Sequence, residues 1–197
     1  RLFWQCDAKE RNQALYLISQ KLQLRMKEIL ACNAEDAAQA KKLNLNPAII
    51  DRLTLTPERI LAMAQVAEAI AKQEEVVGRI DEERTLPNGL RVQRQRIPLG
   101  VIAMIFESRP NVVIDCSCLA IKSGNAMILK GGKEAARSNQ ILTEIVQESI
   151  KGLLPMSLIQ MIEGQEAVME LITLADYVDL VIPRGGESLV RTIYANS

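Results

Sequence analysis

Two short apolar segments, residues 101–106 and 126–129, most constrain what this chain can fold into. Neither segment alternates polar and apolar residues, which is the pattern of strands that are buried on both faces of a parallel sheet. Each segment is followed by a polar loop, at residues 107–111 and 130–133. Ligands of parallel sheets bind at the carboxyl ends of the strands, so these two loops predict a nucleotide site.

The alternation of strand and helix continues beyond these two segments. Strands are predicted near residues 100–106, 126–130, 158–162 and 178–182, and helices near residues 111–123, 134–150, 165–174 and 186–194. Such alternation implies right-handed crossover connections between parallel strands. The predicted fold class is therefore α/β, with a Rossmann-like, doubly wound parallel sheet over residues 98–197.

Residues 1–78 are predicted to form a helical segment that precedes the sheet. Apolar residues recur at helical spacing from Leu15 to Ile29, which predicts one long amphipathic helix over about residues 7–31. A second helix is expected over residues 34–43. Thr56 followed by Pro57 is typical of a helix start, and the apolar stripe beyond it predicts a third helix that runs to about Glu75.

Residues 79–97 are predicted to form a β-hairpin, because Asn88-Gly89 is preferred in two-residue turns in which both residues adopt positive φ. Such a hairpin either projects toward a partner subunit or covers the edge of a sheet. Arg91, Arg94 and Arg96 lie on its second arm. They form either a solvated basic edge or an anion-binding group.

Composition excludes several classes of function. The 24 basic and 24 acidic residues cancel, which argues against a nucleic-acid surface. The chain contains no histidine, so Ser-His pairs, Cys-His pairs and HExxH zinc sites are excluded, and no metal site is expected. With 48% hydrophobic residues in 197, the chain can bury a sizeable core, and it has no long apolar span.

The four cysteines, Cys6, Cys32, Cys116 and Cys118, show no CxxC pairing and no ladder of even spacings. This usage favours a reducing, cytoplasmic location over a disulfide framework. Cys116 and Cys118 are two residues apart on a predicted helix and point to different faces. We expect both to be small buried hydrophobic residues.

Two glycine pairs follow predicted strands. Lys130, Gly131, Gly132 and Lys133 offer backbone amides and two ammonium groups beside a helix start, which suits phosphate and ribose hydroxyls. The second pair, Gly185-Gly186, also lies between an apolar strand and a helix. Neither loop is a Walker motif, and the chain contains no GxGxxG. Each pair is either a ligand contact or a tight strand-to-helix turn.

Long stretches of this sequence resemble those of a known family. RIPLGVIAMIFESRPNVVIDCSCLAIKSGNAMILKGGKEA and YVDLVIPRGGESLVR closely resemble the gamma-glutamyl phosphate reductases of proline biosynthesis, in the aldehyde dehydrogenase superfamily. The resemblance extends upstream through NAEDAAQAKKLNLNPAIIDRLTLTPERI and covers essentially the whole chain. It implies reduction of L-glutamyl 5-phosphate by NADPH to L-glutamate 5-semialdehyde.

The resemblance also implies roles for individual residues. Lys130 matches the lysine that contacts the adenosine ribose, the neighbouring Gly131 and Gly132 belong to the same cofactor loop, and Gly185 and Gly186 match the glycine turn along the pyrophosphate and nicotinamide. Lys133 stands where many NAD-using relatives have a glutamate, and an ammonium there favours the 2′-phosphate of NADPH.

Substrate contacts are expected from Arg109 and Asn111, Arg109 binding a carboxylate or phosphate of the substrate or forming a structural ion pair. The family's nucleophilic cysteine lies after the segment that matches PRGGESLVR. We therefore expect residues 1–197 to be an incomplete NADP-binding domain with no catalytic residue, no catalytic domain and no activity alone.

Two further readings remain open. The chain could be a non-catalytic binding or assembly module that keeps the same fold, in which case residues 79–97 are its natural interaction site. It could also be a phosphate-loop transferase, which the lack of a Walker motif disfavours. If the chain is part of a reductase, we expect the full-length protein to be a homo-oligomer and its substrate to be a small molecule.

Overall fold

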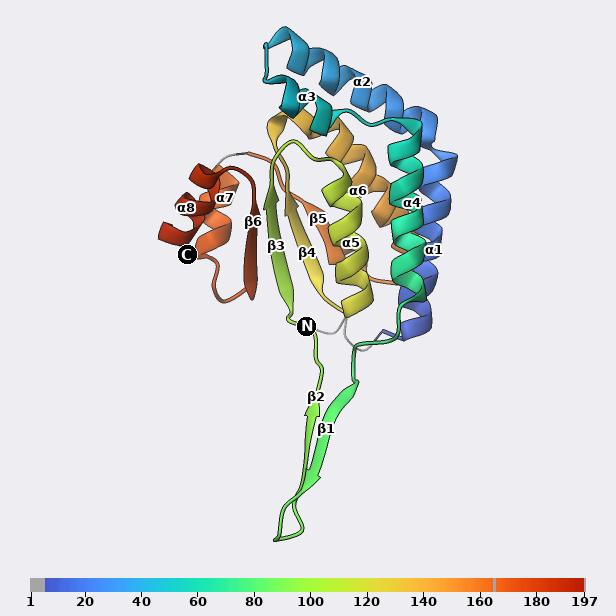
Figure 1. The fold of residues 1–197 in the computed structure, drawn as a ribbon, viewed down its shortest axis with the longest axis vertical. Helices are drawn as coiled ribbons and strands as arrows, with labels where there is room; N and C mark the ends of the chain where they lie inside the picture. Colours follow the sequence, from blue (N-terminus) through green and yellow to red (C-terminus); the bar gives the residue numbers. More distant parts are fainter. Residues whose placement is uncertain (1–5, 165, 197) are drawn as a thin grey trace.

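The computed structural model describes residues 6–164 and 166–196. Four helices form the first part of the chain: α1 (Ala8–Leu24), α2 (Met26–Lys42), α3 (Pro47–Leu53) and α4 (Pro57–Lys72). A hairpin follows, with strands β1 (Ile80–Thr85) and β2 (Arg91–Gln95) (Figure 1). No helix of these described residues is long and apolar enough to cross a membrane.

Strands and helices alternate in the second part of the chain. The elements are β3 (Val101–Phe106), α5 (Asn111–Ser123), β4 (Ala126–Lys130), α6 (Ala136–Ile150), β5 (Ile159–Met161), α7 (Glu166–Thr173), β6 (Leu180–Arg184) and α8 (Glu187–Asn196), with short 3₁₀ turns η2 (Lys133–Ala135) and η3 (Met156–Leu158). All four strands of this sheet are parallel, in the order β5-β4-β3-β6. The predicted doubly wound sheet is confirmed, because the chain moves from β3 to β4 and β5 and then crosses to β6 on the other side of β3.

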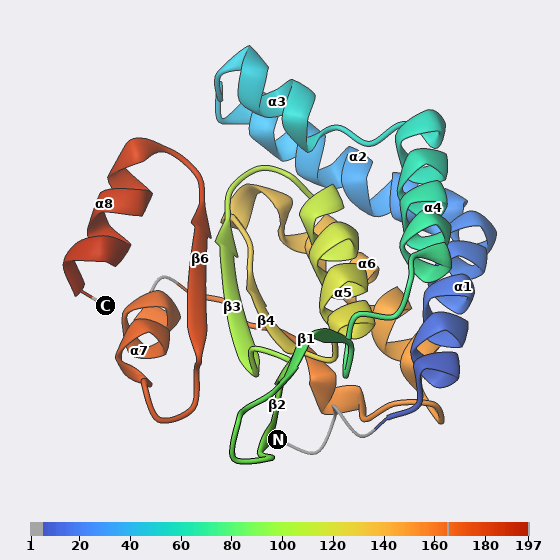
Figure 2. The ribbon, with the colours of Figure 1, turned by 60° about the horizontal axis from the view of Figure 1, so that its bottom comes forward.

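The sheet is buried on both faces, which explains why its strands do not alternate in polarity. Ile102, Met104 and Phe106 of β3 belong to the main core with α1, α4, α5 and α6. Ala103 and Ile105 of the same strand belong to a smaller core with α7 and α8. Figure 2 shows these two layers, with α5 and α6 on one face of the sheet and α7 and α8 on the other.

The prediction of one helix over residues 7–31 is wrong, because the chain bends at Arg25. Arg25 has φ −94° and ψ 15°, and it ends α1 and precedes α2. Its guanidinium binds Glu28 at 2.7 Å and Glu148 of α6 at 3.1 Å. α2 then contacts α6 as a separate helix and includes the segment expected to start at residue 34.

The helical segment differs from the prediction at α3 and at the end of α4 as well. α3 was not expected, although Asn46 caps it by accepting a hydrogen bond from the amide of Ala48 at 2.9 Å, and Pro47 opens it. α4 ends at Lys72, before the expected Glu75. The extended chain beyond Lys72 lets the carbonyl of Gln73 accept a hydrogen bond from Lys122 of α5 at 2.7 Å.

The hairpin projects from one end of the molecule, opposite α2 and α3 (Figures 1 and 2). It forms its own two-stranded sheet, so it does not extend the edge of the four-stranded sheet. The predicted two-residue turn is wrong. A three-residue loop joins Leu86 to Leu90, and within it Gly89 has a positive φ of 83° while Asn88 does not. Pro87 holds a negative φ and favours a type I turn, which Gly89 completes.

The arginines of the second arm pair with carboxylates of the first arm. Three ion pairs join the arms: Arg91 to Glu83 at 2.6 Å, Arg94 to Glu82 at 3.7 Å and Arg96 to Asp81 at 2.7 Å. All these side chains are exposed or nearly so. These solvated ion pairs individually stabilise little and add to the backbone pairing of the two strands.

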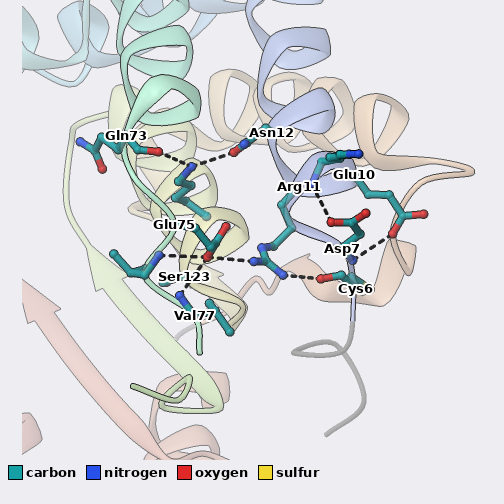
Figure 3. A network of polar contacts seen from close by, with 12 residues as sticks. Cys6, Asp7, Glu10, Arg11, Asn12, Gln73, Glu75, Val77 and Ser123 are labelled. Carbon is teal, nitrogen blue, oxygen red and sulfur yellow. Dashed lines mark hydrogen bonds and ion pairs between the residues drawn. The ribbon is translucent and has the colours of Figure 1, made fainter. Parts of the chain in front are cut away.

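Buried polar contacts join α1 to α5 and to the chain that follows α4, near the base of the hairpin (Figure 3). Arg11 of α1, which is 2% exposed, forms an ion pair with Glu75 at 2.9 Å. The carboxylate of Glu75 also accepts hydrogen bonds from the amides of the next two residues. Lys122 of α5 donates to Asn12 at 2.8 Å and to the carbonyl of Gln73. The network fixes the chain where it leaves α4 and enters the hairpin.

Candidate functional site

Two neighbouring cavities lie at the carboxyl ends of the parallel strands. The first, which we call the α8 cavity, has a volume of about 630 Å³ and is lined by Lys130, Gly131, Gly132, Lys133, Asn139 and residues of α7 and α8. The second, the α3 cavity, has a volume of about 840 Å³ and is lined by Arg109, Arg184, Gly185, Gly186 and residues of α2 and α3. Glu107, Lys133 and Glu134 line both cavities. Both volumes suit a small-molecule ligand.

The first glycine loop forms a wall of the α8 cavity. Val168, Met169 and Leu189 provide an apolar surface in the same cavity, with the hydroxyls of Ser188 and Thr192 beside it. Such a combination of apolar contact and a few polar groups is typical of cofactor sites.

Gly131 is required for packing as well as for any ligand contact. A Cβ atom at this position would lie 2.1 Å from Nδ2 of Asn139. Asn139 is 3% exposed, and its Oδ1 is a buried acceptor with no hydrogen-bond partner among the described residues. Unpartnered buried acceptors are rare, and one that lines a cavity fits a ligand hydroxyl. The sequence analysis did not single out Asn139, because its role depends on this contact with Gly131.

Gly132 makes room for the carboxylate of Glu134. A Cβ atom at Gly132 would lie 2.2 Å from Oε1 of Glu134. The same oxygen accepts hydrogen bonds from the amide of Ser108 at 2.8 Å and from its hydroxyl at 2.6 Å. Ser108 is buried and has a φ of 41°, which non-glycine residues seldom adopt. Glu134 therefore joins the loop after β4 to the loop after β3.

The second glycine pair is arranged around another carboxylate. The amide of Gly186 donates to Oε2 of Glu107 at 2.8 Å. A Cβ atom at Gly185 would lie 2.6 Å from the same oxygen and 2.7 Å from Leu189. Gly185 and Gly186 line the α3 cavity, whereas Gly131 and Gly132 line the α8 cavity. The two predicted glycine loops thus lie in adjacent cavities on either side of Glu107.

The two residues of the 108–111 loop that were predicted to bind substrate have different surroundings. Arg109 lines the α3 cavity, and it forms no ion pair with any of the described residues. Asn111 belongs to the first turn of α5, and its amide donates to Asp115 at 2.9 Å. Burial raises the pKa of Asp115, an effect that the Asn111 hydrogen bond and the charge of Arg184 oppose.

None of the four cysteines lines either cavity. Burial raises the pKa of the Cys116 thiol to about 11, and it raises the pKa of Cys118 further. The pKa values of Cys6 and Cys32 are also raised, mainly by burial. All four thiols are protonated at neutral pH, whereas a thiol nucleophile reacts as the thiolate. Within residues 6–164 and 166–196 there is no cluster of three acidic or thiol groups that could hold a metal ion.

Comparison with known proteins identifies close relatives. The profile of the aldehyde dehydrogenase family matches residues 3–197. The gamma-glutamyl phosphate reductase of Thermobifida fusca is 42% identical over 194 residues, which are 97% of this chain and 46% of that protein. The chain thus spans just under half the length of this curated relative.

Solved structures agree with the sequence comparison. The crystal structure of gamma-glutamyl phosphate reductase from Thermotoga maritima has a TM-score of 0.95 and 36% identity, over 100% of this chain and 49% of that one. A more distant neighbour, the succinic semialdehyde dehydrogenase of Streptococcus pyogenes in complex with NADP⁺, shares the fold, with a TM-score of 0.73 and 17% identity over 96% of this chain and 38% of that one.

Proposed function

Because the chain belongs to the aldehyde dehydrogenase family, we propose that it is the NADPH-binding part of an oxidoreductase that reduces L-glutamyl 5-phosphate to L-glutamate 5-semialdehyde in proline biosynthesis. The α8 cavity carries this proposal, since it brings a glycine loop, two lysines and an apolar surface together at the carboxyl ends of the strands. The name of the relatives that match along almost the whole chain supports the reaction.

The residues of the α8 cavity fit a dinucleotide. Lys130, Gly131 and Gly132 would hold the adenosine ribose and phosphate, with backbone amides and one ammonium group. The unpartnered Oδ1 of Asn139 can accept a hydrogen bond from a ribose hydroxyl. Val168 and Leu189 can pack against the adenine ring.

Lys133 supports NADPH over NADH. Its side chain is exposed, lines both cavities and forms no ion pair among the described residues. An ammonium in this position attracts the 2′-phosphate that distinguishes NADPH from NADH. When bound, NADPH supplies the hydride for the reduction.

The remaining predicted residues would act at the substrate end. Gly185 and Gly186 would line the pyrophosphate and nicotinamide side, in a loop that Glu107 holds through the Gly186 amide. Arg109 would bind an anionic group of the substrate in the α3 cavity. Asn111 lines neither of the two cavities, and its amide donates to Asp115. None of the four cysteines would be the nucleophile, because their thiols are protonated and lie away from both cavities.

The proposal extends to assembly and location. The projecting hairpin would join copies of the full-length protein into a homo-oligomer, since it is exposed on both arms and pairs only with itself among the described residues. A reducing, cytoplasmic location would suit the four free thiols.

Cofactor binding and turnover by the full-length protein test the proposed function. L-Glutamate 5-semialdehyde, inorganic phosphate and NADP⁺ should give the acyl phosphate, NADPH and a proton, followed by the absorbance of NADPH. Lys130→Ala should weaken NADPH binding at least tenfold in a fluorescence titration, whereas Lys151→Ala, just after the end of α6, should not. A full-length protein that binds NADPH without this phosphate-dependent turnover would contradict the proposed reaction.

A further inference from the structure

The α3 cavity carries an excess of positive charge that the protein does not neutralise. Three carboxylates line it, and each is already engaged. Asp36 accepts hydrogen bonds from the amide and hydroxyl of Ser138 at 2.8 and 2.7 Å. Glu107 accepts from the Gly186 amide, and Glu134 accepts from Ser108. These carboxylates therefore hold the walls of the cavity in place.

Five basic side chains line the same cavity: Arg52, Arg109, Lys133, Arg137 and Arg184. Arg137 is paired, with Glu35 at 2.8 Å and Asp36 at 3.8 Å. The other four form no ion pair within the part of the chain that the structure describes. A cavity that holds several unpaired cations attracts anionic ligands.

The unpaired cations come from two different walls. Arg109, Lys133 and Arg184 belong to loops and strand ends at the edge of the sheet. Arg52 belongs to the last turn of α3. α2 and α3 lie beyond the ends toward which the strands run (Figures 1 and 2). Leu43, Leu45 and Ile49 line the cavity on this helical side and supply an apolar surface beside Arg52.

This distribution of charge and apolar surface defines a class of ligand. A short aliphatic molecule with an anionic group at each end could pair with Arg109 on one wall and Arg52 on the other, and place its methylene groups against Leu43, Leu45 and Ile49. The Gly185–Gly186 turn, which would line the nicotinamide, lines this cavity too, and Glu107, two residues before Arg109, holds it through the Gly186 amide. The reacting group therefore belongs at the end near Arg109, and the second anionic group belongs at Arg52.

We propose that Arg52 is a specificity-determining residue that binds the α-carboxylate of the substrate, while Arg109 binds its phosphate end. This inference rests on the proposed reaction and adds to it a residue of the helical segment, 57 positions before Arg109. Arginine suits this role because its planar guanidinium can bind a carboxylate through two hydrogen bonds.

The test compares two aldehydes in the full-length protein. L-Glutamate 5-semialdehyde has the α-carboxylate, and 4-aminobutanal is the same aldehyde without it. Arg52→Gln should raise KM for L-glutamate 5-semialdehyde by about tenfold to a hundredfold, with kcat within twofold. KM for 4-aminobutanal and the Kd of NADPH should not change. Arg52→Lys should restore part of the loss.

Lys42→Gln is the matched control, because it removes one positive charge from the end of α2 without lining the cavity. Equal effects of Arg52→Gln on the two aldehydes, or no effect on either, would overturn the role of Arg52. Calorimetric titration with L-glutamate separates this failure from that of the proposed reaction. If the protein shows no turnover, the site is still supported when Arg52→Gln binds L-glutamate more weakly and Lys42→Gln does not. Equal L-glutamate binding by Arg52→Gln and Lys42→Gln refutes the site.

Discussion

Glu134 accepts two hydrogen bonds from Ser108, one from its backbone amide at 2.8 Å and one from its hydroxyl at 2.6 Å. The two residues are 26 positions apart and belong to loops that follow adjacent parallel strands. Ser108 has a φ of 41°, a strained conformation that persists only because the surrounding structure holds it. This contact sets the position of the loop that carries Arg109.

Removing this carboxylate should loosen the loop. We expect Glu134→Ala to lower the free energy of unfolding by about 1–3 kcal/mol, because a buried amide and a buried hydroxyl lose their acceptor. Urea unfolding followed by circular dichroism measures the change. Glu144→Ala on the exposed face of α6 should cost less than about 1 kcal/mol. Equal losses in the two variants would show that the contact with Ser108 contributes nothing specific.

Lys133→Glu should change the cofactor preference of the full-length protein. An attractive contact with the 2′-phosphate of NADPH becomes a repulsive one, so NADPH should weaken at least tenfold more than NADH. Fluorescence titration with both cofactors measures the ratio. Lys151→Glu makes the same charge change at the end of α6 and should leave the ratio unaltered. Equal losses for NADPH and NADH would mean that Lys133 does not contact the 2′-phosphate.

Much of the sheet could be predicted because its strands are short and apolar throughout. Burial of β3 on both faces leaves no room for polar residues, so the sequence shows a continuous apolar run. The break at Arg25 could not be predicted in this way. No proline or glycine marks it, and one partner of Arg25 at the bend is Glu148, more than 120 residues away.

In the candidate site, too, local patterns could be predicted and contacts between distant segments could not. The glycine loops were visible because glycine pairs after apolar strands are a local pattern. The carboxylates of Glu107 and Glu134 were not recognised, since their partners, Gly186 and Ser108, are close only in the folded chain. The prediction of the hairpin turn was wrong for a local reason. Pro87 favours a type I turn, so only Gly89 has a positive φ.

Burial of Cys116 should make the free energy of unfolding fall as the pH rises in the alkaline range. Its pKa is raised to about 11 from an ordinary value of 9.0, so the unfolded chain loses this proton at lower pH than the folded chain does. The contribution of Cys116 to the free energy of unfolding is therefore fully present below pH 9. It is lost as the pH rises toward 11, and the loss is roughly 2–3 kcal/mol at most. Urea unfolding between pH 8 and 11 should therefore show a shallower decline for Cys116→Ala than for the unmodified protein. Parallel curves would contradict this.

Deletion of residues 83–91 tests the proposed role of the hairpin. The hairpin is exposed along both arms and forms its own sheet, so its loss should leave the main core intact. Light scattering of the full-length protein should then show a smaller assembly, with an unchanged circular dichroism spectrum for the remaining helices. An unchanged mass would exclude the hairpin as the assembly element.

The buried ion pair between Arg11 and Glu75 should respond asymmetrically to substitution (Figure 3). The side chain of Arg11 is 3% exposed and that of Glu75 is 32% exposed. Glu75→Gln leaves a buried guanidinium without its counter-charge and should cost about 3–5 kcal/mol of unfolding free energy. Arg11→Met leaves a carboxylate whose Oε1 still accepts two amide hydrogen bonds, so it should cost about 1–3 kcal/mol.

Urea unfolding of the single and double variants measures this asymmetry. The double variant, Arg11→Met with Glu75→Gln, should be more stable than Glu75→Gln alone, because no unpaired charge then remains buried. Arg59→Met, which breaks the exposed pair with Asp51, is the control and should cost at most about 1 kcal/mol. If Arg11→Met were the more damaging single substitution, packing of the long arginine side chain would outweigh its charge, and the network would join α1 to the hairpin base mainly through that packing.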